Sequence, residues 1–554
     1  MLAITDVGRP TQPNLLQVAD LNFWYDAHQA RPETRALKDV GFSLERGAIT
    51  AIVGESGSGK STLINAILGL HSSRNHRLDA RSLRFDDVDL TALSHRQWRE
   101  IRGRRIGYIA QDASGSLNPL RRIGSQLEEV LVLHHPTLKR GTARKAALER
   151  LTHVGFDDPQ RIFDSYPHQL SGGMNQRVAI AAALAGNPQL ILADEPTSAL
   201  DVSVQRQVLD HLTRAIKRSG VSLLLITHDL ALAADRADRI LVMKSGEIVE
   251  NGPTRSVLSE PRHEYTKALI AAAPMLTDEV GTATTLSPAA SPLLQVRDLS
   301  KTYGDRKGAA VSAFAKVSFD LHPRETLCIV GESGSGKTSL VRTLLQLTEA
   351  DTGSVAFNGY AVGDLKGGDL KRFRRDAQMV YQNPYASLNS RHRISTILRE
   401  PLAIHDIGTR SEQKEAARSL LSRVGLPESF LTRRPSQLSG GQRQRIAIAR
   451  ALITGPKLLV LDEAVSALDV SAQQAVLELL KELQESLGLT YLFITHNLAV
   501  ARQFSDRVLV MREGRIVEHG ATAQIFTSPQ HPYTRQLLEA APGFEASALV
   551  HGHH

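Results

Sequence analysis

One long unit occurs twice in this chain. Gly54 to Ser61 reads GESGSGKS and Gly331 to Thr338 reads GESGSGKT, while LSGGMNQR from Leu170 corresponds to LSGGQRQR from Leu438. The spacing between the two LSGG segments also separates Glu195 from Glu463, His228 from His496 and Tyr265 from Tyr533. Because 554 residues are too many for one hydrophobic core, the repeat predicts two similar domains.

The pattern within each copy predicts an α/β fold. Apolar runs of strand length alternate with amphipathic stretches, which is typical of a parallel sheet flanked by helices. Strands are expected at Ile49–Val53, Leu190–Ala193, Leu223–Thr227, Leu327–Val330, Leu458–Leu461 and Tyr491–Thr495. A mainly helical insert is expected before each LSGG segment. The predicted domains are residues 1–276 and 293–554, joined by a flexible linker at residues 277–292 that is rich in Thr, Ser, Ala and Pro.

Composition excludes several classes of protein. The longest apolar runs are far shorter than the roughly 20 residues that cross a bilayer, and Met1 to Pro10 lacks the features of a secretory signal. A cytoplasmic location is therefore expected. The single cysteine, Cys328, cannot form an internal disulfide or a thiolate metal cluster, and we expect it to be buried.

The charge of the chain is only mildly basic. A net charge of +8 over two domains is well below that of a dedicated nucleic-acid binder, so no nucleic-acid partner is expected. Two basic groups, at 96–105 and 371–375, leave two interpretations open: a solvated helix face, or attraction to an anionic membrane surface.

Both glycine-rich segments fit the pattern G-x-x-x-x-G-K-[ST] between a strand and a helix, which is typical of a phosphate-binding loop. Glycines let backbone N–H groups converge on phosphate oxygens, and the helix N-terminus adds positive potential. Lys60 and Lys337 are expected to reach the β- and γ-phosphates, and Ser61 and Thr338 to offer a hydroxyl to Mg²⁺. The predicted nucleotide-binding residues are Gly54, Glu55, Ser56, Gly57, Ser58, Gly59, Lys60, Ser61 and Thr62, and Gly331, Glu332, Ser333, Gly334, Ser335, Gly336, Lys337, Thr338 and Ser339.

A pair of acids follows one apolar strand in each copy. Asp194-Glu195 comes after LILA and Asp462-Glu463 after LLVL. The first acid can hold the Mg²⁺ shell while the second activates the attacking water as general base. Paired acids alone could simply be solvated, but these stand in the right order and at the right distance from a phosphate loop.

The segments LSGGMNQR and LSGGQRQR, followed by DEPTSALD and DEAVSALD, resemble the signature, Walker B and D-loop of ATP-binding cassette (ABC) ATPases. The resemblance covers nearly the whole chain, twice. It implies two tandem P-loop NTPase domains, each with a RecA-like parallel-sheet core, an antiparallel β edge and a helical subdomain. It also implies ATP and Mg²⁺ as ligands, hydrolysis of ATP, and cassettes that face each other head to tail with each ATP between them.

Further site residues follow from this resemblance. Gln111 and Gln382 match the Q-loop glutamine, which touches Mg²⁺ and reports to the membrane partner. His228 and His496, each after a strand ending in Ile-Thr, match the switch histidine that contacts the γ-phosphate. The implied signature and D-loop contacts are Ser171, Gly172, Gly173 and Asp201, and Ser439, Gly440, Gly441, Gln442 and Asp469.

Tyr25 and Tyr303 match the aromatic residue that stacks on adenine, although either ring could instead pack on its own sheet. Two departures from the family pattern matter. Met174 replaces the usual signature glutamine, and Ala464-Val465 replaces the Pro-Thr pair of the first copy. Since both bases and both histidines are present, we predict two hydrolytic sites, with the site that uses the Met174 signature modestly weaker.

The tails HEYTKALIAAAP (263–274) and HPYTRQLLEAAP (531–542), with SLNP at 116–119 and SLN at 387–389, resemble the oligopeptide and dipeptide importers. Fusion of both cassettes narrows this to subunits such as those of microcin C and glutathione importers. The resemblance implies a motor for peptide uptake, peripheral at the cytoplasmic face of the bacterial inner membrane. Its implied partners are two integral-membrane permease subunits and an extracytoplasmic substrate-binding protein.

Other cassette proteins fit less well. A soluble twin-cassette ATPase that acts in translation typically has a long charged linker, whereas 277–292 is short and weakly charged. A DNA-repair cassette protein or a metal-cluster recycling factor needs cysteines that this chain lacks. An exporter usually carries its spanning helices in the same chain, or uses a single cassette that dimerises. The cargo stays open between dipeptides, oligopeptides, glutathione, microcin C and nickel.

Overall fold

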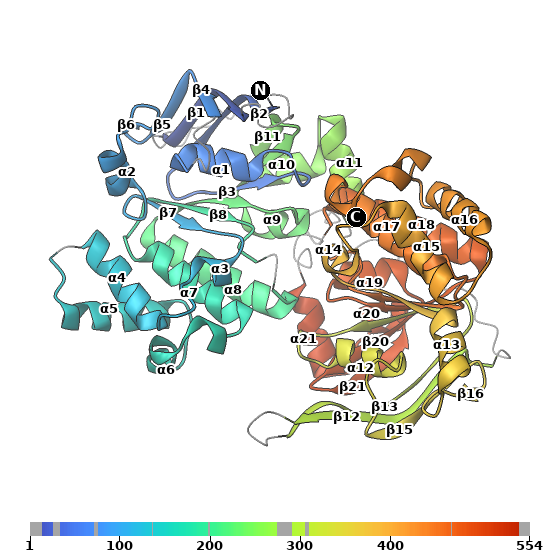
Figure 1. Cartoon of the computed structure of the whole chain (residues 1–554). Coiled ribbons are helices and arrows are strands. Elements are labelled where there is room, and N and C mark those ends of the chain that lie inside the picture. The colour runs from blue at the N-terminus through green and yellow to red at the C-terminus, as the bar shows by residue number, and fades with distance from the viewer. Residues whose placement is uncertain are drawn as a thin grey trace, which may run out of the picture. The chain divides into compact units, whose positions relative to one another are not determined.

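The computed structural model describes residues 14–25, 34–70, 76–135, 137–197, 200–273, 291–304, 310–466 and 468–541. These residues form two compact units, one ending at Ala273 and the other running from residue 291 to residue 541 (Figure 1). The predicted linker, 277–292, lies almost entirely outside the described residues. Among those residues, no helix is both long and apolar enough to span a membrane.

The first unit is built on a six-stranded sheet of order β11-β10-β3-β9-β8-β7. All neighbouring strands in it are parallel except the β10–β11 pair. Every residue of β3, β8 and β9 is buried, as expected for parallel strands covered on both faces. The strands are β3 (Ile49–Val53), β7 (Ile106–Ile109), β8 (Leu190–Asp194), β9 (Ser222–Ile226), β10 (Arg239–Lys244) and β11 (Glu247–Pro253).

A separate antiparallel sheet covers helix α1 (Lys60–Leu68) on the side away from the parallel sheet. Ile64 and Ile67 of α1 share one apolar core with Phe23 and Phe85 of this sheet and with Leu192 of β8. The helix is thereby held between the two sheets. The antiparallel strands are β1 (Asn14–Tyr25), β2 (Thr34–Glu45), β4 (His76–Asp79), β5 (Ser82–Phe85) and β6 (Val88–Asp89), followed by α2 (His95–Ile101).

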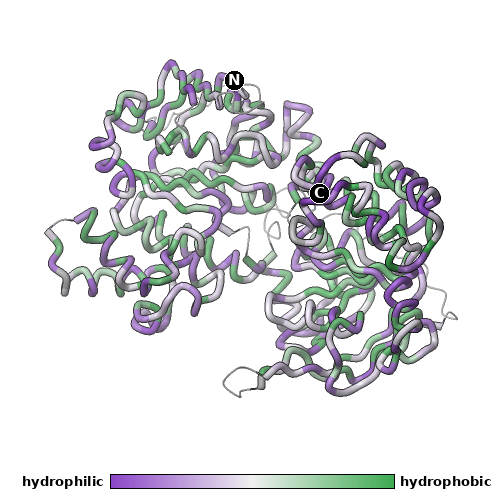
Figure 2. Tube along the Cα trace, viewed as in Figure 1, coloured by the Kyte–Doolittle hydropathy of each residue, from purple (hydrophilic) through white to green (hydrophobic). Residues whose placement is uncertain are grey.

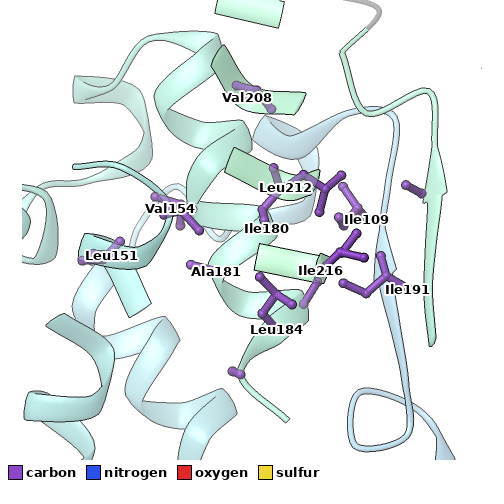
Figure 3. Packing of buried hydrophobic residues seen from close by; sticks show 14 of the residues in the cluster. Ile109, Leu151, Val154, Ile180, Ala181, Leu184, Ile191, Val208, Leu212 and Ile216 are labelled. Atoms are coloured by element: carbon purple, nitrogen blue, oxygen red, sulfur yellow. The ribbon is translucent and has the colours of Figure 1, made fainter. Parts of the chain in front are cut away.

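The predicted helical insert is present. It comprises α3 (Ala113–Ser116), α4 (Ile123–His134), α5 (Arg140–His153) and α6 (Pro159–Asp164), and leads into α7 (Gly172–Leu184) and α8 (Val202–Ser219). Leu151 and Val154 belong to the same apolar cluster as Ile180 of α7, Leu212 of α8 and Ile191 of the sheet (Figure 3). Helix α7, which begins within the LSGG segment, is therefore packed against both the insert and the core. The unit ends with α9 (Leu230–Arg236), α10 (Thr254–Ser259) and α11 (Glu264–Ala272).

The second unit repeats this architecture, with one sheet of order β17-β18-β19-β14-β20-β21 and another of order β13-β12-β15-β16. The first sheet consists of β14 (Thr326–Val330), β17 (Ala377–Val380), β18 (Leu458–Asp462), β19 (Thr490–Ile494), β20 (Arg507–Arg512) and β21 (Arg515–Ala521). The second consists of β12 (Leu294–Gly304), β13 (Ala310–Leu321), β15 (Thr352–Phe357) and β16 (Tyr360–Ala361). The helices are α12 (Lys337–Leu344), α13 (Gly367–Asp376), α14 (Pro384–Ser387), α15 (Ile394–Ile404), α16 (Arg410–Arg423), α17 (Gly440–Leu452), α18 (Val470–Leu487), α19 (Leu498–Phe504), α20 (Thr522–Thr527) and α21 (Pro532–Ala540).

The predicted fold class is confirmed in both units. The observed strands match the expected ranges to within one residue at each end, and Figure 2 shows hydrophobic residues concentrated along the central strands. Cys328 is buried in β14 as expected, and this burial raises the pKa of its thiol.

Candidate active site

The phosphate-loop pattern lies between β3 and α1 in the first unit. Gly57 and Gly59 have φ of 82° and 103°, a left-handed backbone that favours glycine. A Cβ atom on Gly54 would lie 2.1 Å from the carbonyl oxygen of Met243 on β10, and one on Gly331 would lie 2.2 Å from a carbonyl on β20. The glycines of this pattern are thus required by the neighbouring strand as well as by the curvature of the loop.

The loop lysine is buried above its own loop. Lys60 is 7% exposed, and its Nζ donates hydrogen bonds to the carbonyl oxygens of Gly54 and Glu55, each at 2.7 Å. Lys337 makes the same pair of contacts at 2.7 and 2.8 Å. Both lysine charges are therefore held by neutral carbonyl groups at the start of the helix, where phosphates bind in loops of this kind.

A carboxylate at the end of a neighbouring strand contacts the hydroxyl that follows this lysine. Asp194 of β8 is hydrogen-bonded to Ser61, and burial raises the pKa of Asp194 above its ordinary value although this hydrogen bond opposes the shift. In the second unit, burial and the charge of Glu463 raise the pKa of Asp462 to about 6. A hydroxyl and a carboxylate beside a phosphate position fit Mg²⁺, which uses one or two protein oxygens together with phosphates and water.

The second acid of each pair has an unusual backbone. Glu195 has φ of 45° and Glu463 has φ of 47°, a conformation that is uncommon outside glycine and clusters at functional sites. The N–H of Glu195 donates to the carbonyl of Ile226 at 3.0 Å, and Glu463 makes the equivalent bond at 2.9 Å. The turn at the strand end thus directs the first acid toward the loop hydroxyl and the second toward another set of partners.

Those partners are the predicted glutamine and histidine. Nε2 of Gln111 donates to Oε2 of Glu195 at 2.8 Å, and Nδ1 of His228 lies 3.2 Å from Oε1 of the same carboxylate. In the second unit, Gln382 and His496 approach Glu463 at 2.7 and 3.3 Å. Three segments that are distant in sequence therefore meet at each predicted base.

This environment keeps the predicted base ionised. Burial tends to raise the pKa of Glu195, but the hydrogen bonds and charges of its neighbours, mainly His228, outweigh burial and lower it. The pKa of Glu463 is lowered in the same way by its own neighbours. Burial tends to lower the pKa of His228, but its hydrogen bond and ion pair with Glu195 raise it. Glu195 and Glu463 are therefore carboxylates at neutral pH and can accept a proton.

The two signature segments differ at one hydrogen bond. Ser171 begins α7 and accepts from the N–H of Met174 at 3.3 Å, and Ser439 begins α17 and accepts from the N–H of Gln442 at 3.3 Å. Only Gln442 also accepts a return bond, from the Ser439 N–H at 3.0 Å, which completes a capping box. Met174 instead packs against the apolar core.

The remaining signature and D-loop residues lie at helix starts. Gly172 and Gly173 open α7, and a Cβ atom on Gly173 would lie 2.2 Å from the Val204 side chain of α8. Gly440 and Gly441 open α17 in the same way. The D-loop aspartates stand immediately before α8 and α18, as Asp201 and Asp469. Contact of these residues with nucleotide stays a prediction.

The two candidate adenine-stacking residues end equivalent strands. Tyr25 and Tyr303 are 40% and 41% exposed at the ends of β1 and β12. The Tyr25 hydroxyl lies 3.3 Å from that of Thr62, and Nζ of Lys301 lies 5.6 Å from the centre of the Tyr303 ring. Both rings thus stand beside a phosphate loop or a lysine and are partly exposed, and their stacking on adenine stays a prediction.

One contact at each site was not predicted from the sequence. The tail tyrosines Tyr265 and Tyr533 accept hydrogen bonds from the backbone N–H groups of Glu55 and Glu332, at 3.1 and 3.4 Å. The repeated H-x-Y-T motif marked the tails as distinctive but carried no sign that they reach the loops. Only the tertiary fold brings residues about 200 positions apart into contact.

Comparison with known proteins agrees with this geometry. The sequence model of the ABC transporter family matches residues 37–198 and 314–466, and that of the oligopeptide/dipeptide transporter C-terminal region matches 249–311 and 517–552. The glutathione import ATP-binding protein GsiA of Pectobacterium atrosepticum is 41% identical over 564 residues, which cover 96% of this chain and 90% of that protein. GsiA of Escherichia coli O157:H7 is 42% identical over 566 residues, with the same coverage.

Among solved structures, the dimeric ATP-binding cassette MJ0796 in a post-hydrolysis state bound to ADP and Pi is 29% identical, with a TM-score of 0.38. That alignment covers 41% of this chain and 98% of the solved chain.

Two phosphate loops, two acid pairs at strand ends and two LSGG helices, together with these family matches, define the class: the chain belongs to the ABC transporter family, its two units are ATP-binding cassettes, and the protein hydrolyses ATP with Mg²⁺. Within that family it is the ATP-binding subunit of a peptide-type importer, because both cassettes carry the oligopeptide/dipeptide C-terminal region. The comparisons do not favour the alternative of an ATPase that acts in translation.

Proposed function

We propose that the chain powers the uptake of glutathione or related short peptides. The observation that carries this proposal is the likeness to glutathione import ATP-binding proteins over 96% of the chain, including both C-terminal regions. The ATP-binding residues do not contact cargo, so the substrate class rests on this likeness. Microcin C and nickel are the competing cargoes from the sequence analysis.

The proposed partners follow from the same relationship. A motor subunit of this family works with two integral-membrane permease subunits, and an extracytoplasmic binding protein delivers the solute. The chain would then lie peripherally at the cytoplasmic face of the bacterial inner membrane. The prediction that each ATP is completed by the signature segment of the other cassette is part of this proposal and comes from the family resemblance.

The roles proposed for the first cassette follow from its geometry. Lys60, held by the loop carbonyls, meets the phosphate charge, and Ser61 with Asp194 holds Mg²⁺. When bound, the ion would neutralise negative charge on the β- and γ-phosphates. Glu195 accepts a proton from the attacking water, while Gln111 and His228 fix its carboxylate.

The same roles are proposed for the second cassette. Lys337 meets the phosphates, Thr338 and Asp462 hold Mg²⁺, and Glu463 is the base. Gln382 and His496 fix the base in this cassette.

Transport by a reconstituted complex tests the proposal. The purified chain and a candidate permease pair would be placed in vesicles with the binding protein, and ATP-dependent accumulation of labelled glutathione, a dipeptide and nickel would be compared. A complex in which Glu195 and Glu463 are both replaced by Gln serves as the control without hydrolysis. We expect accumulation of glutathione or the dipeptide only with the active chain. Accumulation of nickel alone, or failure of the chain to associate with any permease pair, would overturn the proposal.

A further inference from the structure

The tail helix of each cassette contacts its own phosphate loop through one tyrosine. Tyr265 lies on α11 and is 7% exposed, and its hydroxyl accepts from the backbone N–H of Glu55 at 3.1 Å. Tyr533 on α21 accepts from the N–H of Glu332 at 3.4 Å. The same hydroxyl contact recurs in both copies, at the tyrosine of the shared H-x-Y-T motif, which indicates that the hydroxyl has a purpose beyond packing the ring.

The tyrosine hydroxyl and the loop lysine form hydrogen bonds with the same peptide group. The Gly54 carbonyl accepts from Lys60 Nζ at 2.7 Å, and the N–H of the same peptide group, on Glu55, donates to Tyr265. The C=O and N–H of a trans peptide point in opposite directions within one plane. The lysine and the tyrosine therefore hold this group from opposite ends and fix its rotation, and Lys337 and Tyr533 do the same in the second cassette.

The tail is itself firmly anchored. On β11, the Glu250 carboxylate accepts from the N–H groups of Arg262 and His263 at 2.9 and 3.1 Å. Nδ1 of His263 accepts from the Tyr265 N–H at 3.0 Å. The corresponding contacts of the second cassette join Glu518 to the N–H of Gln530 at 2.7 Å and to the N–H of His531 at 3.1 Å. The His and Tyr of each H-x-Y-T motif thus each make a defined hydrogen bond, and the Thr is buried.

The ring is fixed from a second direction. Nζ of Lys244, at the end of β10, lies 4.7 Å from the centre of the Tyr265 ring, and the Arg512 guanidinium carbon, at the end of β20, lies 4.8 Å from that of Tyr533. These are distances at which a cation attracts an aromatic face. Burial, with the charge of Glu332, raises the pKa of Tyr533 to about 12, so its hydroxyl stays neutral.

We propose that Tyr265 and Tyr533 are positioning residues for nucleotide binding, each holding the first peptide group of the phosphate loop in the orientation that Lys60 or Lys337 needs to meet the phosphates. The C-terminal region is then part of the nucleotide site in addition to being a marker of the family. The inference deepens the ATPase function and does not depend on the cargo proposed above.

Tyr265→Phe in the full-length chain tests this inference, because it removes the hydroxyl and keeps the ring. Lys337→Ala removes nucleotide binding at the second loop, so that titration with a fluorescent ATP analogue in the presence of Mg²⁺ measures binding at the first loop alone. We expect the Kd to rise about two- to tenfold, the effect of one hydrogen bond, with little change in the Tm. In the chain with both loops intact, the KM for ATP should rise while kcat changes less.

Thr266→Val is the matched control, since it removes a buried hydroxyl next to Tyr265 on the same helix and leaves the tyrosine in place. It should leave the Kd nearly unchanged. Tyr533→Phe in a Lys60→Ala chain repeats the test on the second loop. An unchanged Kd in both tyrosine variants, or a rise no larger than that of Thr266→Val, would overturn the inference. Either result would leave the transport proposal standing, because transport is judged with the parent chain.

Discussion

Replacing His228 with alanine is expected to move the acid limb of the ATPase pH profile to higher pH. Nδ1 of His228 lies 3.2 Å from Glu195, and burial alone would raise the pKa of Glu195. The hydrogen bond and charge of His228 are the main influences that lower this pKa. Without the histidine the pKa of the base rises, so that a larger share of Glu195 is protonated, and inactive, at a given acidic pH.

The size of the effect follows from the lost contact. A hydrogen bond to a charged group contributes about 1.5–3 kcal/mol, which corresponds to roughly ten- to 150-fold in rate. Because the His228 side chain is 33% exposed, solvent weakens the contact and we expect the lower end, about a tenfold loss of kcat on the acid limb where Glu195 titrates, with a smaller loss at neutral pH. Hydrolysis would be measured across pH in a Glu463→Gln background, where turnover depends on Glu195. The same measurement on the second cassette uses His496→Ala in a Glu195→Gln background.

Stability gives an independent check of the sign. A carboxylate whose folded pKa is lowered contributes stability that is present above its unfolded pKa and lost as pH falls through the folded pKa. A histidine whose folded pKa is raised contributes stability below its unfolded pKa and loses it as pH rises through the folded pKa. The Glu195–His228 pair therefore stabilises the folded chain most at a pH above the unfolded pKa of the glutamate and below the unfolded pKa of the histidine. A loss of kcat that is equal at every pH, with an unmoved acid limb, would show that His228 does not act through the pKa of Glu195.

Three further predictions follow from single contacts. Gln442→Met removes the capping-box hydrogen bond of α17 and should lower the free energy of unfolding by about 0.5–1 kcal/mol, measured by thermal unfolding. The reverse change, Met174→Gln, can form a capping box on α7 but loses packing against the core, so it should change stability less. Gly54→Ala places a Cβ atom 2.1 Å from a backbone carbonyl and should abolish ATP binding to the first loop, whereas Gly141→Ala, with open space around it, should not. Glu325→Ala removes the fully buried partner of Arg507 and should cost about 3–5 kcal/mol in denaturant unfolding; a loss below 1 kcal/mol would contradict the pairing.

The parts of the site that depend on local sequence could be predicted from it. A glycine-rich loop between a strand and a helix fixes where Lys60 stands, and a buried strand that ends in two acids fixes where Asp194 and Glu195 emerge. The order of strands in a parallel sheet then places the ends of β3, β8 and β9 side by side. The family pattern added Gln111 and His228, whose local sequences alone carry little information.

Other features depend on tertiary contacts that no local pattern encodes. The hydrogen bond between Tyr265 and the Glu55 N–H joins residues from opposite ends of one cassette. The positive φ of Glu195 follows from its N–H bond to the next strand, and nothing in the residue type signals it. Met174 departs from the family pattern in sequence, but its packing against the core depends on the tertiary placement of the insert against α7.

The ATPase rates of Glu195→Gln, Glu463→Gln and the double variant show whether both cassettes hydrolyse ATP. Removal of a general base costs about 10²–10⁴ in rate, so each single variant should clearly reduce turnover and the double variant should fall by at least the lower figure. If either single variant keeps the full rate of the parent chain, one cassette does not hydrolyse ATP and the prediction of two hydrolytic sites is wrong.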